Sequence, residues 1–172
     1  LGGDVRALGV GIGDVVALDP LRVEGDQADE HDDAEGWQPF KSFTSRLNRG
    51  FGDPNLKFIA SPWTPPPWMK TNGRYGGGKL RRECYPVFAE YLVRFIEAYL
   101  QEGVPIHALT IQNEPEFGPE AYPTCLWTAL EQRDFIRNHL GPLFRARRID
   151  TAIWVFDHNF NNPEFPATIL RD

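Results

Sequence analysis

Apolar positions along the chain follow two different spacings, and together they predict alternating strands and helices. Short runs rich in strand-forming residues occupy positions 56–60, 106–112 and 152–156. Between the first two runs, apolar side chains recur every three or four residues over positions 85–100. This spacing is typical of an amphipathic helix, and Gly103 is a suitable residue to end it.

A second helix is predicted from its start signal. Thr128 fits the N-cap position, and Glu131, three residues later, completes the pattern of a capping box. The helix is expected to continue to about Leu143. The resulting order is strand, helix, strand, helix, strand, with about 45–50 residues between the starts of successive strands. Such alternation predicts a parallel sheet with helices packed outside it.

The first 38 residues have a different character. They contain ten of the 24 acidic residues but two of the 18 basic residues, and positions 24–35 almost lack apolar side chains. A metal-binding acidic loop would need a ligand spacing that is absent here, so a solvated loop or disordered segment is the preferred interpretation. We therefore divide the chain into an acidic segment, 1–38, and an α/β domain, 39–172, which is expected to begin with a short helix over 40–47.

Length, charge and cysteine content exclude several classes of protein. The 172 residues are long enough for one core, and the formal net charge of −6 argues against nucleic acid as a partner. No run of about 18 apolar residues is present, which argues against a transmembrane segment. Cys84 and Cys125 are too few for a disulfide framework, and either could pair or be a lone apolar residue. No metal-ligand spacing and no phosphate-binding glycine motif after a strand is found, so neither metal nor nucleotide cofactor is expected.

Polar and aromatic side chains follow each predicted strand, where a parallel α/β protein places its binding site. They are Ser61 and Trp63, Asn113 and Glu114, and Asp157, His158 and Asn159. The long loops that carry them favour a (β/α)8 barrel over a doubly wound sheet. Because a complete barrel needs about 250 residues, this chain would supply less than two thirds of one.

Glu114 is the leading catalytic candidate, because a glutamate presented at a strand end can act as a general acid. An exposed loop glutamate in a surface ion pair fits the same position, and Asn113 could either donate to a sugar hydroxyl or cap the loop. Trp63 offers a flat face on which a sugar ring can stack, or it packs the loop down. Lys70, in the same loop, could pair with a carboxylate, reach a substrate hydroxyl or be a surface charge.

Four motifs, taken in order and with their spacing, resemble glycoside hydrolase family 30, the family of lysosomal glucosylceramidase and its bacterial relatives. They are SPWTPPPWMKTNG at 61–73, TIQNEP at 110–115, YPTCLW at 122–127 with EQRDFI at 131–136, and FDHN at 156–159. The resemblance implies a partial (β/α)8 TIM barrel, covering roughly strands 3 to 5 with their helices. It also implies hydrolysis of β-glycosides with retention of configuration and without a cofactor.

The resemblance assigns roles to particular residues. Glu114 corresponds to the general acid/base, and Asn113 to the residue that holds the sugar 2-hydroxyl. Trp63 matches the family's active-site tryptophan, and Asp157 and His158 match the polar residues that border the pocket. The implied partner is a carbohydrate or glycolipid substrate, with the sphingolipid glucosylceramide as the default. The oligomeric state and compartment stay open; relatives are commonly secreted or lysosomal.

Retaining hydrolysis needs a second carboxylate, about 5–5.5 Å from the first, as nucleophile. The family places that glutamate after the seventh strand, which is expected beyond Asp172. The chain begins without methionine and ends inside a predicted helix, so we expect a fragment that is marginally folded and inactive alone. Two alternatives remain: a non-catalytic carbohydrate-binding remnant, or a small complete α/β domain of unrelated function.

Overall fold

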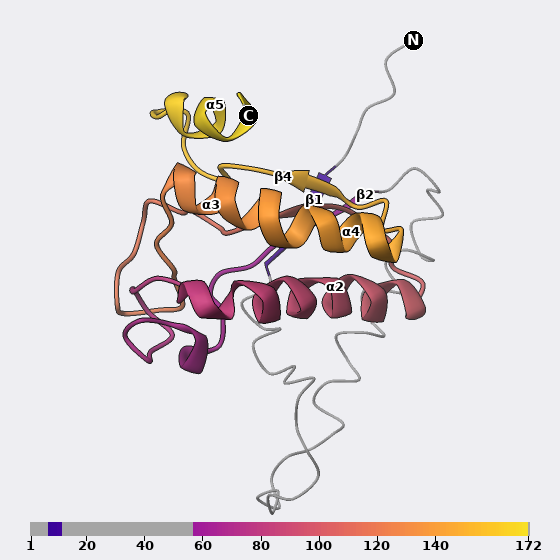
Figure 1. Ribbon diagram of the computed structural model, residues 1–172, viewed down its shortest axis with the longest axis horizontal. Helices are drawn as coiled ribbons and strands as arrows, with labels where there is room; N and C mark the ends of the chain where they lie inside the picture. The colour runs from indigo at the N-terminus through magenta and orange to yellow at the C-terminus, as the bar shows by residue number, and fades with distance from the viewer. Residues whose placement is uncertain (1–6, 12–56, 172) are drawn as a thin grey trace, which may run out of the picture.

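The computed structural model describes residues 7–11 and 57–171, which form a parallel sheet with helices along it (Figure 1). The sheet has four strands in the order β1 (Ala7–Gly11), β2 (Lys57–Ser61), β3 (Ile106–Thr110) and β4 (Ala152–Trp154), and every neighbouring pair is parallel. The three predicted strands are thereby confirmed to within two residues. The helix expected over 40–47 and the acidic stretch 24–35 lie outside the described residues.

β1 is an element that the sequence did not predict, and it lies within the acidic segment. It pairs with β2 residue for residue, from Ala7 opposite Lys57 to Gly11 opposite Ser61. Its sequence, ALGVG, contains two glycines and has no clear alternation of polar and apolar positions. Strand prediction depends on that alternation, so the pairing partner rather than the local pattern identifies this strand.

The first predicted helix is confirmed as α2 (Tyr85–Gln101). Two short 3-10 turns, Pro67–Met69 and Arg82–Cys84, precede it in the loop after β2. Its apolar face, which includes Phe88, Leu92 and Ile96, is buried. Gly103 follows in the left-handed conformation, with φ of 78°. A glycine adopts this backbone without steric cost, which is why the helix ends here.

The second predicted helix runs further than expected. It comprises α3 (Ala129–Phe135), a π-helical turn (Ile136–Leu140) and α4 (Gly141–Arg147), and the capping box between Thr128 and Glu131 is present. The helix passes Leu143 because Pro142 falls in the first turn of α4, where its missing N–H is not needed. It ends at Arg148, whose φ is 55°.

The helices cover one face of the sheet. Figure 1 shows α2 beside the α3–α4 run, with α5 (Glu164–Leu170) near α3. Phe58, Ala60 and Leu109 point into the core that these helices enclose, and both Cys84 and Cys125 are free thiols. No helix among the described residues combines the length and apolar character needed to span a bilayer.

The other face of the sheet is only partly covered: Ile59 and Ala152 are half-buried, whereas Ala108 and Thr110 are buried. Ile59, Ala108 and Ala152 lie next to one another on it, followed by the pair Thr110 and Trp154. The Trp154 side chain is 45% exposed although it lies on a strand. In a closed barrel this face is the interior, where side chains from opposite strands fill the space.

Candidate active site

The ends of three neighbouring strands are held together beyond the sheet itself. After β3, the backbone N–H of Asn113 donates to the carbonyl of Pro62, which follows β2, at 2.8 Å. On the other side, Asn113 and Asp157 form an isolated parallel bridge. The structure therefore brings together the loops that carry Trp63, Glu114 and Asp157, as the strand-end argument predicted.

Glu114 has a backbone conformation that is uncommon for its residue type. Its φ is 46°, in the left-handed region, which costs about 1–2 kcal/mol for a residue with a Cβ atom. Two hydrogen bonds hold it there: its N–H donates to the Asp157 carbonyl at 2.7 Å, and its own carbonyl accepts from the Phe117 N–H at 2.9 Å. The Glu114 side chain is half-buried at the carboxyl end of β3.

The Asp157 carboxylate is bound by two hydroxyl groups from the neighbouring strands. The Ser61 hydroxyl donates to Oδ2, and Thr110 Oγ1 lies 3.2 Å from the same oxygen and 2.9 Å from Ser61 Oγ. We call these three residues the Ser61–Thr110–Asp157 cluster. Sequence reasoning predicted Asp157 as a substrate contact but did not find this cluster, because its members are separated by 47 to 96 positions along the chain.

Three aromatic rings from the loops after β2 and β3 form a row. The Trp63 and Tyr122 rings lie 6.1 Å apart between centroids, and the Tyr122 and Phe117 rings 6.4 Å apart. Tyr122 is 40% exposed and Phe117 46% exposed, while Trp63 is half-buried. Gln112 holds the Trp63 backbone by donating to its carbonyl at 2.6 Å. Phe117 was missed in the sequence; the available signal was its place three residues after Glu114.

His158 lies against the same strand end. Its ring packs on that of Phe156, with 5.6 Å between centroids, and its N–H donates to the Phe156 carbonyl. Within the described residues, neither nitrogen of the buried imidazole has a hydrogen-bond partner.

The position of Lys70, in the loop that carries Trp63, differs from what the sequence predicted. None of the three alternatives, a carboxylate pair, a substrate contact or a surface charge, is what the structure shows. The side chain is fully buried, and its ammonium donates to Thr64 Oγ1 at 2.9 Å and to the Tyr75 and Thr124 carbonyls at 2.6 Å each. Burial lowers the pKa of Lys70. All three donors are used, so Lys70 joins the loop after β2 to the loop after β3.

The order of these features along the chain matches a known family. Residues 39–172 match the model of the glycosyl hydrolase family 30 TIM-barrel domain. The chain belongs to glycosyl hydrolase family 30. The resemblance found in the sequence and the α/β partial-barrel fold are both confirmed.

Several members of family 30 are similar to this chain. The endo-1,6-beta-D-glucanase of Neurospora crassa is 40% identical over 121 residues, which cover 68% of this chain and 25% of the glucanase. The lysosomal acid glucosylceramidase of Mus musculus is also 40% identical, over 126 residues that cover 68% of this chain and 24% of that protein. The chain therefore spans about a quarter of the length of these relatives.

A solved structure shows the same arrangement of elements. The endo-beta1,6-glucanase BT3312 superposes with a TM-score of 0.72 at 32% identity, and the match covers 77% of this chain and 32% of that chain. SrfJ from Salmonella typhimurium gives a TM-score of 0.68 at 34% identity, covering 78% and 29%. The partial barrel of this family 30 chain thus corresponds to about a third of each solved chain.

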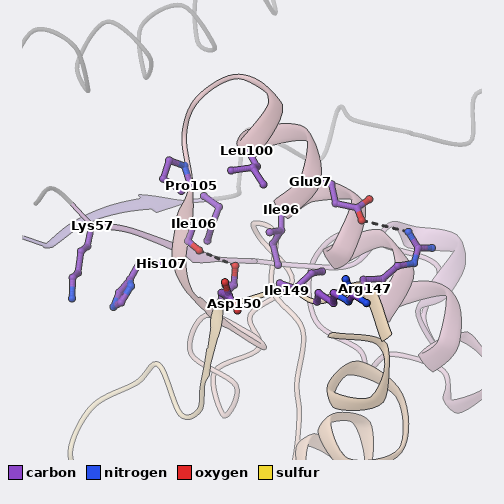
Figure 2. Close-up of a pocket in the computed structure, with 12 residues that line it drawn as sticks. Lys57, Ile96, Glu97, Leu100, Pro105, Ile106, His107, Arg147, Ile149 and Asp150 are labelled. Carbon is purple, nitrogen blue, oxygen red and sulfur yellow. Dashed lines mark hydrogen bonds and ion pairs between the residues drawn. The ribbon is translucent and has the colours of Figure 1, made fainter. Parts of the chain in front are cut away.

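A cavity of about 570 Å³ lies away from Glu114, at the amino-terminal edge of the sheet. Figure 2 shows Lys57 and His107 at the starts of β2 and β3, with Arg147 turned toward Glu97, to which it is ion-paired at 3.4 Å. Family 30 barrels, like other TIM barrels, carry their chemistry at the opposite edge. Within the part of the chain that the structure describes, no group of three or more His, Cys, Asp or Glu residues could hold a metal ion.

Proposed function

We propose that this chain supplies the acid/base side of the active site of a retaining β-glycosidase, with Glu114 as the general acid/base. The observation that carries the proposal is the placement of Glu114 at the carboxyl end of β3, with its backbone held by Asp157 and a row of aromatic rings on the loops after β2 and β3. Family 30 membership supports a β-glycosidase.

The chemistry uses the carboxyl group of Glu114 twice. In the first step a second carboxylate bonds to the anomeric carbon and forms a glycosyl-enzyme intermediate, while the protonated Glu114 donates to the glycosidic oxygen as the bond to the leaving group breaks. In the second step the carboxylate removes a proton from the water that hydrolyses the glycosyl-enzyme intermediate. In this proposal Asn113 donates to the sugar 2-hydroxyl, the Trp63 ring packs on a sugar face, and Asp157 and His158 border the pocket.

The nucleophile of this mechanism is assigned to a glutamate outside the chain, after the seventh strand of the barrel. Two carboxylates near Glu114 fit the role poorly. Asp157 Oδ2 is engaged by the hydroxyls of Ser61 and Thr110, which stabilise its negative charge and lower its nucleophilicity. Glu116 is exposed and accepts a hydrogen bond from Asn162 Nδ2 at 2.8 Å.

The substrate class follows from the names of the relatives. One relative is named for a 1,6-beta-D-glucan and another for a glucosylceramide. We therefore propose a β-linked carbohydrate or glycolipid with a glucosyl unit at the site beside Trp63. The exposed Phe117 and Tyr122 rings would contact the group on the far side of the scissile bond.

The test is Glu114→Gln in the complete enzyme, assayed on substituted phenyl β-glucosides. We expect kcat to fall by about 10²–10⁴-fold for phenols that are poor leaving groups, because these must be protonated, and by much less for activated ones. Glu116→Gln is the matched control: it removes an exposed carboxylate two positions away, and activity should stay near that of the parent.

An equal loss of activity on all leaving groups would contradict the acid/base role of Glu114. The carbohydrate-binding remnant makes a different prediction for the complete protein. It would bind β-glucosides, detectable by calorimetry, but turn over none of them, activated aryl glucosides included.

A further inference from the structure

The Ser61–Thr110–Asp157 cluster joins the carboxyl ends of three neighbouring strands through one oxygen atom. Ser61 is the last residue of β2, Thr110 is the last residue of β3, and Asp157 follows β4. Both hydroxyls approach Asp157 Oδ2, and Thr110 is almost fully buried. A charge-assisted hydrogen bond in such a site is stronger and more restrictive than a neutral one. The Asp157 side chain is therefore fixed relative to both neighbouring strands.

The backbone of the same aspartate contacts the proposed acid/base residue. The Asp157 carbonyl accepts from the Glu114 N–H at 2.7 Å. Asp157 thus has one end bound to Ser61 and Thr110 and the other end bound to Glu114. A displacement of the carboxylate would move the carbonyl that holds the Glu114 peptide.

Uncommon backbone conformations gather at this contact. Among the described residues, three that are not glycine have φ in the left-handed region: Glu114, Phe156 and Arg148. Glu114 is one partner of the hydrogen bond, and Phe156 directly precedes the other partner, Asp157. Such conformations persist where the surroundings impose them, and they concentrate at functional sites.

We propose that Asp157 is a positioning residue for Glu114, acting through the hydroxyls of Ser61 and Thr110 that fix its carboxylate. The cluster keeps the Asp157 carbonyl where it holds Glu114 in its left-handed backbone, and so it aims the Glu114 carboxyl group at the glycosidic oxygen. This inference rests on the proposed function of Glu114, but it assigns roles to Ser61 and Thr110 that the general acid mechanism does not require.

The experiment removes one hydroxyl and keeps the shape of the side chain. Thr110→Val in the complete enzyme is compared with Thr151→Val. Thr151 is also a buried threonine, but its hydroxyl donates to the Ile106 carbonyl at 2.8 Å, near the start of β3. Both variants are assayed on the same series of phenyl β-glucosides, and circular dichroism checks that they fold.

For Thr110→Val we expect kcat to fall by about tenfold on the poorest leaving groups, with little loss on activated ones and little change in KM. Thr110→Ser, which keeps the hydroxyl, should restore the parent profile. Thr151→Val should show no dependence on the leaving group. If Thr110→Val does not fold, Ser61→Ala removes the other hydroxyl and carries the same expectation.

A double variant separates positioning from direct substrate contact. Because Thr110 acts through Glu114, Thr110→Val should cause no further loss in a Glu114→Gln background. An additive loss, or a Thr110→Val profile equal to that of Thr151→Val, would overturn the positioning role. If Glu114→Gln itself shows no leaving-group dependence, it is the proposed function that fails, and the positioning role fails with it.

Discussion

Lys70 is a charged side chain with no exposure to solvent, and in the part of the chain that the structure describes it has no carboxylate partner. Its three hydrogen bonds go to Thr64 in its own loop, to the Tyr75 carbonyl and to the Thr124 carbonyl across the gap between two loops. Those loops present Trp63 and Tyr122 to the site. The Lys70 ammonium is therefore one of the links between the two loops, beside the backbone hydrogen bonds from Thr124 to Tyr75 and from Leu126 to Gly78.

In the complete enzyme, Lys70→Met should lower the free energy of unfolding by about 1–3 kcal/mol, because the buried Thr124 carbonyl loses its Lys70 donor, whereas the Tyr75 carbonyl still accepts from the Thr64 hydroxyl and the Thr124 N–H. Urea unfolding followed by tryptophan fluorescence measures this change. The control is Lys79→Met in the same loop, which breaks the partly exposed ion pair of Lys79 with Glu131 and should cost about 1 kcal/mol or less. Equal losses from the two variants would show that Lys70 is no more than a peripheral charge.

Some site residues could be predicted one by one and others could not. Asn113 and Glu114 follow a strand directly, so their place at the edge of the sheet could be inferred from a short stretch of sequence. Lys70 could not, because a lysine in a polar loop is normally a surface residue and its acceptors are backbone atoms. The Ser61–Thr110–Asp157 cluster depends on the register of three strands, which no local pattern reveals.

Among the elements, α2 contributes most to the buried core and carries two buried phenols. Burial raises the pKa of both Tyr85 and Tyr99 to about 12, and Tyr99 Oη has no hydrogen-bond partner among the described residues. Their ordinary pKa is 10.0. Between these values the unfolded chain releases protons that the folded chain keeps, so the unfolded state is favoured increasingly as pH rises.

We therefore expect full stability from these tyrosines below pH 10 and a progressive loss as the pH rises toward 12. The measurement is the free energy of unfolding of the complete enzyme in urea at several pH values from 9 to 11.5. Tyr99→Phe removes an ionisable group, the buried Tyr99 hydroxyl, and should flatten the decline. A Tyr99→Phe protein that loses stability with the parent's slope would contradict the burial argument.

Elements with a clear period were predicted well, whereas irregular ones were not. The apolar face of α2 and the capping box of α3 are local signals, and both elements were found where expected. The end of α4 was misplaced at about Leu143, next to Pro142, because a proline inside a helix normally ends it. The π-helical turn before α4 places Pro142 in the first turn of α4, where a proline is tolerated. β1 was missed because its short, glycine-containing sequence lacks the alternation of polar and apolar residues that predicts a strand.

At the scale of the whole molecule, the described sheet has one face covered by helices and one face that is only partly covered. Ile59, Ala152 and Trp154 are the partly exposed residues of that second face, which in a closed barrel faces the opposite strands. The long-range contacts of this sheet are therefore only partly made by the described residues, and the proposed mechanism has one of its two carboxylates. The sheet contacts and the second carboxylate both come from several strands of a barrel together, so no single sequence motif can provide them.

From this we expect the purified 172-residue chain to be marginally folded and to hydrolyse no β-glucoside. The checks are thermal unfolding by circular dichroism and turnover of an activated aryl β-glucoside. Turnover by the chain alone that Glu114→Gln abolishes would contradict the assignment of the nucleophile to a residue outside the chain.

The left-handed backbone at position 114 also sets stability against activity. Glycine and asparagine adopt such a backbone at lower cost than glutamate does, so the carboxylate that the proposed reaction needs is retained at the expense of the loop's own stability. A copy of the gene released from selection for hydrolysis would gain stability by replacing this glutamate. The residue at position 114 therefore indicates, more directly than overall similarity, whether a relative is still under selection as a hydrolase.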